Sequence, residues 1–164
     1  MNEKVQIRLA KETDHPTLVR WLKDPAVMPW FPLDNEKEIE DAVRIWLSYI
    51  PQGSAYTLEY EGQLAGMAVI YLHKYKKLRH QSLFAIIMDE RFRGKGLGTL
   101  FMNELKRRSK EVHKLEILHL EVYEGNPAQR LYERLGFKEY GRQTHFLKEK
   151  NGVYRTKINM QLEL

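Results

Sequence analysis

The stretch Arg93-Gly94-Lys95-Gly96-Leu97-Gly98-Thr99 decides how the rest of this sequence is interpreted. It lies between a run of mostly apolar residues, Ser82 to Met88, and a segment whose leucines and phenylalanine recur at helical spacing. A turn between a strand and a helix brings main-chain N–H groups and the positive end of the helix dipole together, which suits an anion. The glycines leave room for phosphate oxygens, and Arg93 and Lys95 add positive charge. The stretch therefore predicts a phosphate-binding turn.

Two common nucleotide-binding motifs do not fit this turn. The spacing G-x-G-x-G differs from the dinucleotide pattern G-x-G-x-x-G, and Lys95 is not followed by the Ser or Thr of the Walker pattern. A glycine-rich connection without any ligand is the alternative interpretation.

The composition is that of a folded protein without cysteine chemistry. The chain has 164 residues, of which 43% are hydrophobic and 30% are charged, so we expect a single domain over residues 1–164. The absence of cysteine excludes disulfides, thiolate metal sites and a covalent acyl-cysteine route. The N-terminal segment lacks the apolar core of a signal peptide, and no run approaches the ~18 apolar residues of a membrane span. We expect a cytoplasmic protein that does not enter a membrane.

The net charge of +5 suits a polyanionic cofactor, a nucleic acid or neither. The densest basic run, Lys106-Arg107-Arg108 with Lys110, falls at the end of a predicted helix, where cations offset the helix dipole. That position favours a solvated helix end over a nucleic-acid surface.

Hydrophobic periodicity and turn residues predict an α/β (α+β) fold. The predicted elements are a strand at Val5–Leu9, a short helix capped by Thr13 or Asp14, a helix with a capping box of Asn35 and Glu38, a hairpin of Tyr56–Tyr60 and Leu64–Tyr71, a strand at Ser82–Met88, a helix from Leu97, a strand at Leu115–Tyr123, a helix around Ala128–Leu135, and a hairpin turned by Lys150-Asn151-Gly152. The strand at Ser82–Met88 is apolar enough to be covered on both faces.

Two motifs resemble the GNAT superfamily of N-acetyltransferases. Arg93-x-x-Gly96-x-Gly98 is similar to the family's R/Q-x-x-G-x-G/A turn, and the segment from Asn126 to Phe137 is similar to its N-(x)-A-x-x-L-Y-x-x-x-G-F segment. One residue separates Asn126 from Ala128, whereas many members have two. The resemblance covers essentially the whole chain and implies a mixed, mostly antiparallel central sheet flanked by about four helices.

The resemblance also implies a cofactor, acetyl-CoA, whose pyrophosphate the turn would hold. Its pantetheine arm would pair with the preceding strand like an added β-strand. The implied cofactor-binding residues are Ile86, Ile87, Met88, Arg93, Gly94, Lys95, Gly96, Leu97, Gly98, Thr99 and Asn126.

Acetyl transfer to an amine needs a neutral amine, a stabilised oxyanion and a proton for the departing thiolate. The resemblance gives Tyr132 the general-acid role, and packing beside Leu131 and Leu135 is the alternative. For the base, Glu121 resembles the strand glutamate of ribosomal-protein N-terminal acetyltransferases, although it could equally be a structural carboxylate. His80 is a second candidate, because an imidazole can accept a proton in neutral solution, and a water relay is a third.

The acceptor side of the site is less defined. Trp30 and Phe31 fall in the region that forms one wall of the acceptor site in the family, where aromatic rings could hold an amine by cation–π contact or simply pack. His113 and His119 lack the spacing of helical zinc ligands, so no metal is predicted. We therefore expect an amine acetyltransferase that acts on a small-molecule or peptide amine by direct attack. The alternative is a catalytically silent acyl-CoA-binding regulatory module. A homodimer is a candidate assembly.

Overall fold

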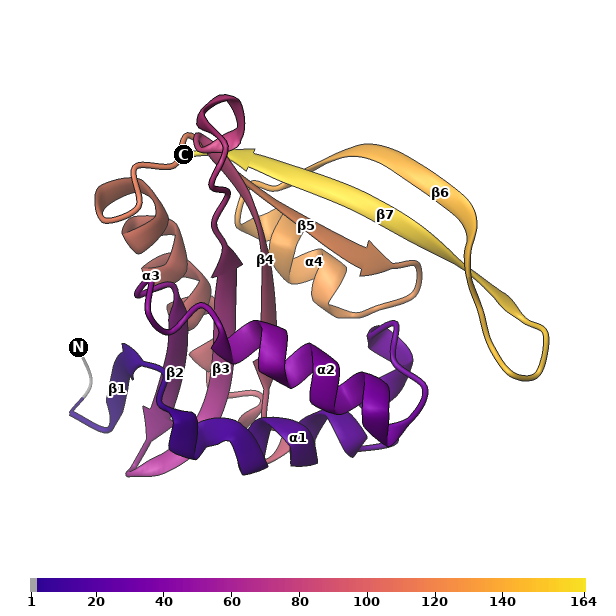
Figure 1. Cartoon of the computed structure of the whole chain (residues 1–164), viewed down its shortest axis with the longest axis horizontal. Helices are drawn as coiled ribbons and strands as arrows, with labels where there is room; N and C mark the ends of the chain where they lie inside the picture. Colours follow the sequence, from indigo (N-terminus) through magenta and orange to yellow (C-terminus); the bar gives the residue numbers. More distant parts are fainter. Residues whose placement is uncertain (1–2) are drawn as a thin grey trace. The chain divides into compact units, whose positions relative to one another are not determined.

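The computed structural model describes residues 3–164, and Figure 1 shows its elements along the chain. The elements follow the order β1 (Val5–Leu9), α1 (His15–Lys23), α2 (Glu36–Leu47), β2 (Ala55–Tyr60), β3 (Gln63–Tyr71), β4 (Gln81–Met88), α3 (Leu97–Glu111), β5 (Ile117–Tyr123), α4 (Ala128–Arg134), β6 (Lys138–Lys148) and β7 (Tyr154–Glu163). The strands follow the order β1-β2-β3-β4-β5-β7-β6 in a mostly antiparallel sheet. The mixed fold expected from the sequence is confirmed.

The chain forms two compact units. The first takes in the chain up to Leu72 together with Phe84–Met102, and the second takes in His73–Leu83 together with Asn103–Leu164. The single domain expected over residues 1–164 stays a prediction.

In the first unit, α1 and α2 pack with strands around one apolar core. Leu18 and Leu22 of α1 and Val43 of α2 are at most 1% exposed, and they cluster with strand residues such as Met67 and Ile87. Strands β2 and β3 form the predicted hairpin, whose turn residues Glu61 and Gly62 both have positive φ angles. This core supports strand β4 and the turn that follows it.

The helix starts of the first unit differ in detail from the predicted caps. Asn35 accepts a hydrogen bond from the main-chain N–H of Glu38 at 3.0 Å, as predicted for α2. The carboxylate of Glu38, however, accepts from the N–H of Asp34, not from that of Asn35, so the capping box is shifted by one residue. Asp14 stands at the cap position of α1, but its carboxylate accepts from Arg8, Thr57 and the N–H of Lys11.

In the second unit, β7 lies between β5 and β6 and pairs antiparallel with both. The start of β4 pairs parallel with β5 over Gln81 to Leu83. Strand β5 begins at Ile117, two residues later than predicted, because Lys114 has a positive φ angle and Leu115 bonds back to Ser109. Strand β4 was expected to be covered on both faces, but its residues alternate between buried and half-buried.

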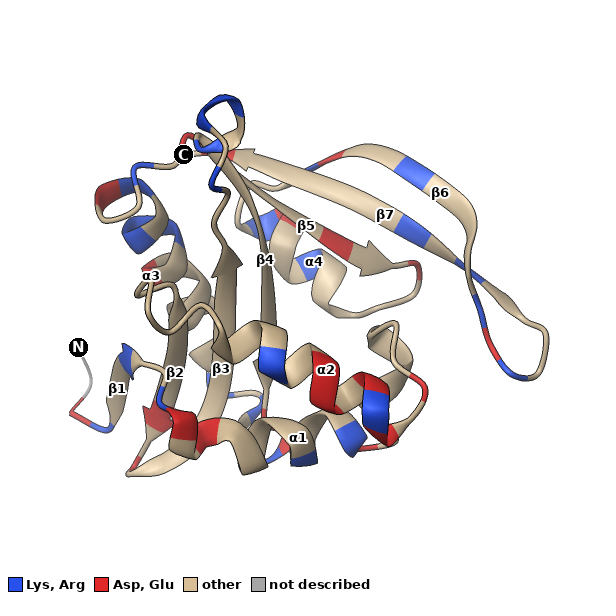
Figure 2. Ribbon diagram, in the orientation of Figure 1, with Lys and Arg blue, Asp and Glu red and all other residues tan. Residues whose placement is uncertain are grey.

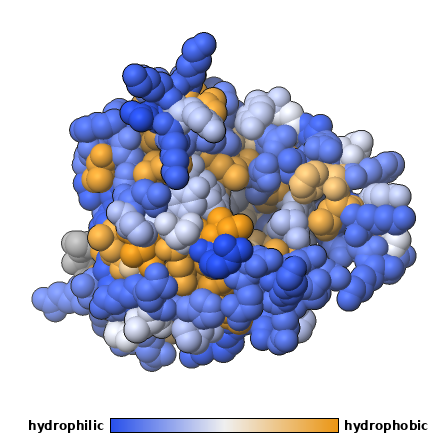
Figure 3. Space-filling view, viewed as in Figure 1, coloured by the Kyte–Doolittle hydropathy of each residue, from blue (hydrophilic) through white to orange (hydrophobic). Residues whose placement is uncertain are grey.

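Hydrophilic side chains cover most of the face shown in Figure 3, and hydrophobic side chains form smaller areas among them. Over residues 3–164, no helix combines the length and apolarity that crossing a membrane requires.

Candidate active site

The predicted phosphate-binding turn connects the end of β4 to α3. Gly94 and Gly96 have φ angles of 75° and 74°, a conformation that glycine adopts without strain. The carbonyl of Gly96 accepts from the N–H of Leu100 at 3.1 Å and so begins the helical bonding of α3. Because the first N–H groups of a helix have no acceptor within it, those of Leu97 to Thr99 are placed to meet an anion.

Both cations of the turn have exposed side chains. The Lys95 ammonium lies 5.7 Å from the centre of the Tyr60 ring, at the end of β2. Among residues 3–164, Arg93 forms no ion pair. Leu97 is only 4% exposed and anchors the start of α3 in the apolar interior. The turn thus combines a fixed helix start with two accessible positive charges.

The three residues predicted to pair with the cofactor arm end strand β4. Ile87 is buried in the first unit's core, whereas Ile86 and Met88 are half-buried. They lie beyond the parallel ladder to β5, which covers Gln81 to Leu83. Gly66 of β3 lies close to the Met88 side chain. A Cβ added at Gly66 would be only 2.6 Å from the Met88 sulfur. Gly66 therefore makes room for the Met88 side chain.

Sequence reasoning missed Asp89, the residue that follows β4. Its carboxylate is buried and accepts from the Trp21 indole Nε1 at 2.9 Å and from the main-chain N–H of Arg91 at 2.9 Å. Burial alone would raise the pKa of Asp89, but the bonds from Arg91 and Trp21 outweigh it and lower that pKa below its ordinary value. The available signal was an acidic residue directly after an apolar strand, which needs a partner.

The second unit holds the predicted general acid, Tyr132, in the middle of α4. Its side chain is buried at 9% exposure, and its ring meets the Phe137 ring at 6.0 Å and 69°. Burial raises the pKa of Tyr132 to about 12. The hydroxyl consequently keeps its proton at every physiological pH, as a proton donor must.

Asn126 has a local structural task in the second unit. Its side-chain oxygen accepts from the main-chain N–H of Ala128 at 3.0 Å, at the first residue of α4. This bond orients the start of the helix that carries Tyr132. The predicted cofactor contact of Asn126 stays a prediction.

Glu121, the first base candidate, lies in β5 among apolar neighbours in the sequence. It occupies an exposed position of β5, and the Lys157 ammonium donates to its Oε1 at 3.2 Å. The same ammonium lies 4.1 Å from the centre of the Phe146 ring. This ion pair fits the alternative of a structural carboxylate bonded to a basic side chain.

His80, the other base candidate, directly precedes β4 and has an exposed side chain. Its main-chain carbonyl accepts from the N–H groups of Glu116 and Ile117, which joins the preceding loop to β5. The base role of either residue stays a prediction.

The two aromatic residues predicted for the acceptor site belong to the first unit. Trp30 ends the short 3₁₀ helix Met28–Trp30 and is half-buried. Phe31 packs against the first unit's core. Thus the turn, the end of β4, Trp30 and Phe31 belong to the first unit, whereas Tyr132, Asn126, Glu121 and His80 belong to the second. Among residues 3–164 there is no group of three or more His, Asp or Glu side chains suited to a metal ion.

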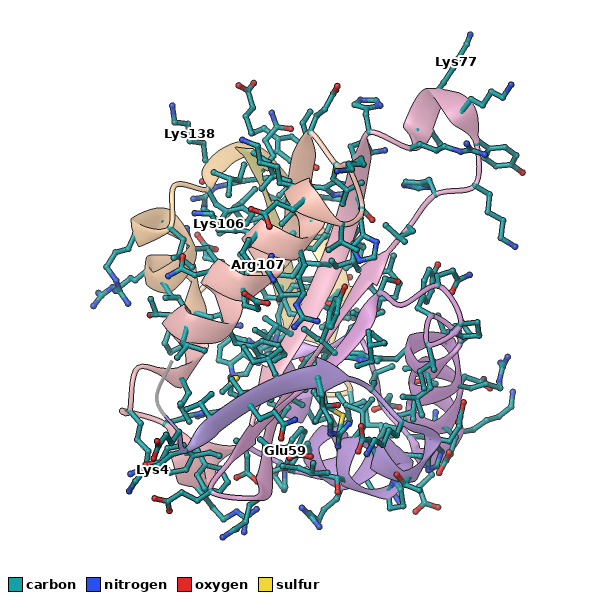
Figure 4. The ribbon with its side chains drawn as sticks, turned by 90° about the vertical axis from the view of Figure 1, so that its left-hand side faces the viewer. Lys4, Glu59, Lys77, Lys106, Arg107 and Lys138 are labelled. Carbon is teal, nitrogen blue, oxygen red and sulfur yellow. The ribbon has the colours of Figure 1, made fainter. Side chains whose placement is uncertain are left out.

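The basic run of α3 is engaged within its own unit, and Figure 4 shows Lys106 and Arg107 on this helix. Lys106 donates to the Leu135 carbonyl at 3.1 Å. Arg107 pairs with Glu104 and Glu111, and Arg108 pairs with Glu104. These contacts favour the interpretation as a solvated helix.

Known proteins resemble the chain in sequence and in fold. Spermine/spermidine N(1)-acetyltransferase of Bacillus subtilis is 36% identical over 89 residues, which are 51% of this chain and 59% of that protein. The chain thus spans less than two thirds of the length of the curated relatives it matches. The crystal structure of ribosomal-protein-alanine N-acetyltransferase from Brucella melitensis is 27% identical with a TM-score of 0.81, over 97% of this chain and 99% of that one.

A Salmonella typhimurium structure containing its cofactor acetyl-CoA has the same fold, with a TM-score of 0.81 at 18% identity over 99% of this chain and 95% of that one. The profile of the acetyltransferase (GNAT) family matches residues 16–137 and so includes both the phosphate-binding turn and the segment around Tyr132. With both motifs inside that match and the fold in agreement, the chain belongs to the acetyltransferase (GNAT) family.

Proposed function

We propose that this chain is an acetyl-CoA-dependent N-acetyltransferase that acetylates a primary amine. The observation that carries the proposal is the turn from Arg93 to Thr99, where two left-handed glycines, the start of α3 and two exposed cations meet in one unit. This arrangement suits a diphosphate, because main-chain N–H groups and basic side chains can both contact its oxygens. Membership of the GNAT family and the names of the relatives support the same activity.

The residues present fit acetyl-CoA as the co-substrate. The turn would hold its pyrophosphate, and the main chain of Ile86 to Met88 would pair with its arm. When bound, acetyl-CoA would supply an acetyl group activated as a thioester. Because the sequence contains no cysteine, we propose direct attack of the amine without an acyl-cysteine intermediate.

Tyr132 is the proposed proton donor to the departing sulfur. Its pKa, raised to about 12 by burial, keeps the hydroxyl protonated until that proton is needed. Removal of a proton from the attacking amine is assigned to Glu121, His80 or a water molecule. Glu121 would have to act beside the Lys157 ammonium, so its use as a base requires that this ion pair loosen.

The proposed acceptor is a small-molecule or peptide amine. The relatives named above act, by their names, on spermine or spermidine and on ribosomal-protein alanine. Both kinds of acceptor present a primary amine, which is the group that we propose for this chain. Formation of a homodimer and a cytoplasmic location stay predictions.

The alternative, a silent module that binds acyl-CoA without turnover, is favoured by the ion pair that occupies Glu121. A nucleic-acid partner is less favoured, because the α3 cations already have partners.

Thiol release separates these possibilities. Purified protein is mixed with acetyl-CoA and a panel of polyamines, amino acids and peptides with free N-termini, and free CoA is measured colorimetrically. We expect release that depends on one class of primary amine and is absent with the matching N-acetylated amine. Binding of acetyl-CoA without release for any acceptor would instead support the silent module.

A further inference from the structure

Asp89 lies where strand β4 passes into the phosphate-binding turn, and its carboxylate connects two distant segments of the first unit. One oxygen accepts from the Trp21 indole of α1, 68 residues earlier, and the other accepts from the main-chain N–H of Arg91. The Arg91 guanidinium also donates to the carboxylate at 2.8 Å. A single buried group thus ties helix α1 to the short 3₁₀ helix Glu90–Phe92, which leads directly into the turn.

Further contacts continue from Arg91 to the cations of the turn. The Arg91 guanidinium lies 5.2 Å from the centre of the Phe92 ring. That ring lies 5.7 Å from the Tyr60 ring, over which the Lys95 ammonium sits at 5.7 Å. Side-chain contacts through Arg91, Phe92 and Tyr60 thus connect Asp89 with Lys95 within one unit.

The chemistry of the reaction gives Asp89 no direct task. A carboxylate repels a phosphate, and the Asp89 side chain is only 6% exposed and directed toward Trp21 and Arg91. A buried carboxylate is costly unless it keeps its hydrogen bonds. The segment around Arg91 must therefore stay in the arrangement that keeps these bonds. The indole nitrogen and the N–H of Arg91 are both fixed by it.

We propose that Asp89 is a positioning residue of the cofactor site, which fixes, together with Trp21, the course of the turn before the cofactor binds. This inference rests on the proposed function, since it requires that the turn hold CoA. A turn that is already ordered loses less conformational entropy on binding and so binds more tightly. Loosening it weakens cofactor binding and leaves the proton transfers at the reacting atoms unchanged.

The first unit offers a matched control in Asp14. This carboxylate is also buried, at 2% exposure, and it also accepts from an Arg side chain, a main-chain N–H and a third side chain. It differs in that its partners are Arg8, Lys11 and Thr57, none of which lies in the segment that leads into the turn. Replacing Asp14 thus tests the loss of a buried carboxylate as such.

The experiment measures the Kd of CoA by calorimetry and steady-state kinetics with acetyl-CoA for the parent and for Asp89→Asn, Trp21→Phe and Asp14→Asn. A cost of about 1.4 kcal/mol for ordering a loosened turn on binding corresponds to about a tenfold weaker affinity. We expect Asp89→Asn and Trp21→Phe each to raise the Kd of CoA and the KM of acetyl-CoA by about tenfold, with kcat at saturation unchanged. Asp14→Asn should lower Tm and leave the Kd of CoA as in the parent.

The outcomes separate the inference from the proposed function. A parent protein that binds no CoA overturns the proposed function and with it the inference. A parent that binds CoA, with unchanged affinity in Asp89→Asn and Trp21→Phe, overturns the inference alone. An equal loss of affinity in Asp14→Asn also overturns it, because general destabilisation then explains the effect. If Asp89→Asn does not fold, Trp21→Phe decides by the same criterion.

Discussion

At the scale of single residues, Tyr132 separates an enzyme from a binding module. Tyr132→Phe keeps the ring that packs against Phe137 and removes only the hydroxyl. We expect kcat to fall by ~10²- to 10⁴-fold, the usual contribution of general-acid assistance, while the KM of acetyl-CoA stays constant. Because the pKa of Tyr132 is raised to about 12, its own ionisation should not reduce the rate below that pH.

Tyr123→Phe is the matched control for this measurement. Tyr123 is a buried tyrosine of the same unit, at 4% exposure, and burial also raises its pKa to about 12. Its variant should turn over at the parent rate. If Tyr132→Phe does so too, the acid is another group.

Gly96 tests the phosphate-binding turn at the same scale. Gly96→Leu adds a side chain where phosphate would approach and strains a backbone with a φ of 74°. We expect the variant to lose binding of acetyl-CoA, measured by calorimetry. Gly53→Leu provides the control, because Gly53 has a φ of 67° in a loop of the same unit and open space around it. It should cost similar stability, ~1–2 kcal/mol, and bind acetyl-CoA normally.

At the scale of elements, helix α3 contains a polar group that burial leaves unsatisfied. Ser109 is 0% exposed, and within residues 3–164 its hydroxyl has no hydrogen-bond partner. Ser109→Ala should stabilise the protein by about 1 kcal/mol, because it removes the unpaired hydroxyl and improves helix propensity. Ser54→Ala should have the opposite effect on Tm in thermal unfolding, since the Ser54 hydroxyl donates to the Ile70 carbonyl at 2.9 Å.

The exposed side of α3 should make stability depend on pH in the acid range. Hydrogen bonds from Arg107, and then from Arg108, lower the pKa of Glu104 from 4.5 to about 2 despite partial burial. The stabilisation is thus complete above pH 4.5 and is lost as pH falls toward 2. Glu104→Gln should lower the free energy of unfolding at pH 7 by about 1 kcal/mol, a value reduced to allow for solvent screening. Urea unfolding at several pH values should also show a smaller loss of stability toward pH 2 in this variant. A parallel decline in parent and variant would contradict this origin.

Sequence patterns predicted elements well where their cause is local. The hairpin turn at Glu61 and Gly62 and the cap at Asn35 depend on residues within a few positions, so their type and place could be read directly. Asp89 could not be placed, because its partner Trp21 comes from a helix 68 residues away. Likewise, the cationic partner of Glu121 is Lys157, 36 residues later. Non-local partners of this kind leave no periodic signal.

At the scale of the whole molecule, cofactor binding should appear as stability. A ligand that binds only the folded form stabilises it by RT ln(1 + [L]/Kd), about 2.7 kcal/mol at one hundred times Kd. Acetyl-CoA should therefore raise Tm, and the shift should grow with the logarithm of its concentration. Figure 2 shows Lys and Arg residues on β6, β7 and the loop before β4. We expect that general attraction of anions to these charges does not produce the rise in Tm. Inorganic sulfate at equal charge concentration should give a much smaller shift, whereas no shift at millimolar acetyl-CoA would contradict the cofactor assignment.

The strand order also places β6 last in the sheet, and Figure 1 shows it beside β7 as a long hairpin. A straight, apolar strand in that position would be a template on which neighbouring molecules could stack. Strand β6 is a poor template, because its register shifts twice, His145 has a φ of 54°, and charged residues, among them Lys138, Arg142 and Lys148, lie along it. We therefore expect these irregularities to disfavour edge-to-edge association between molecules at high protein concentration.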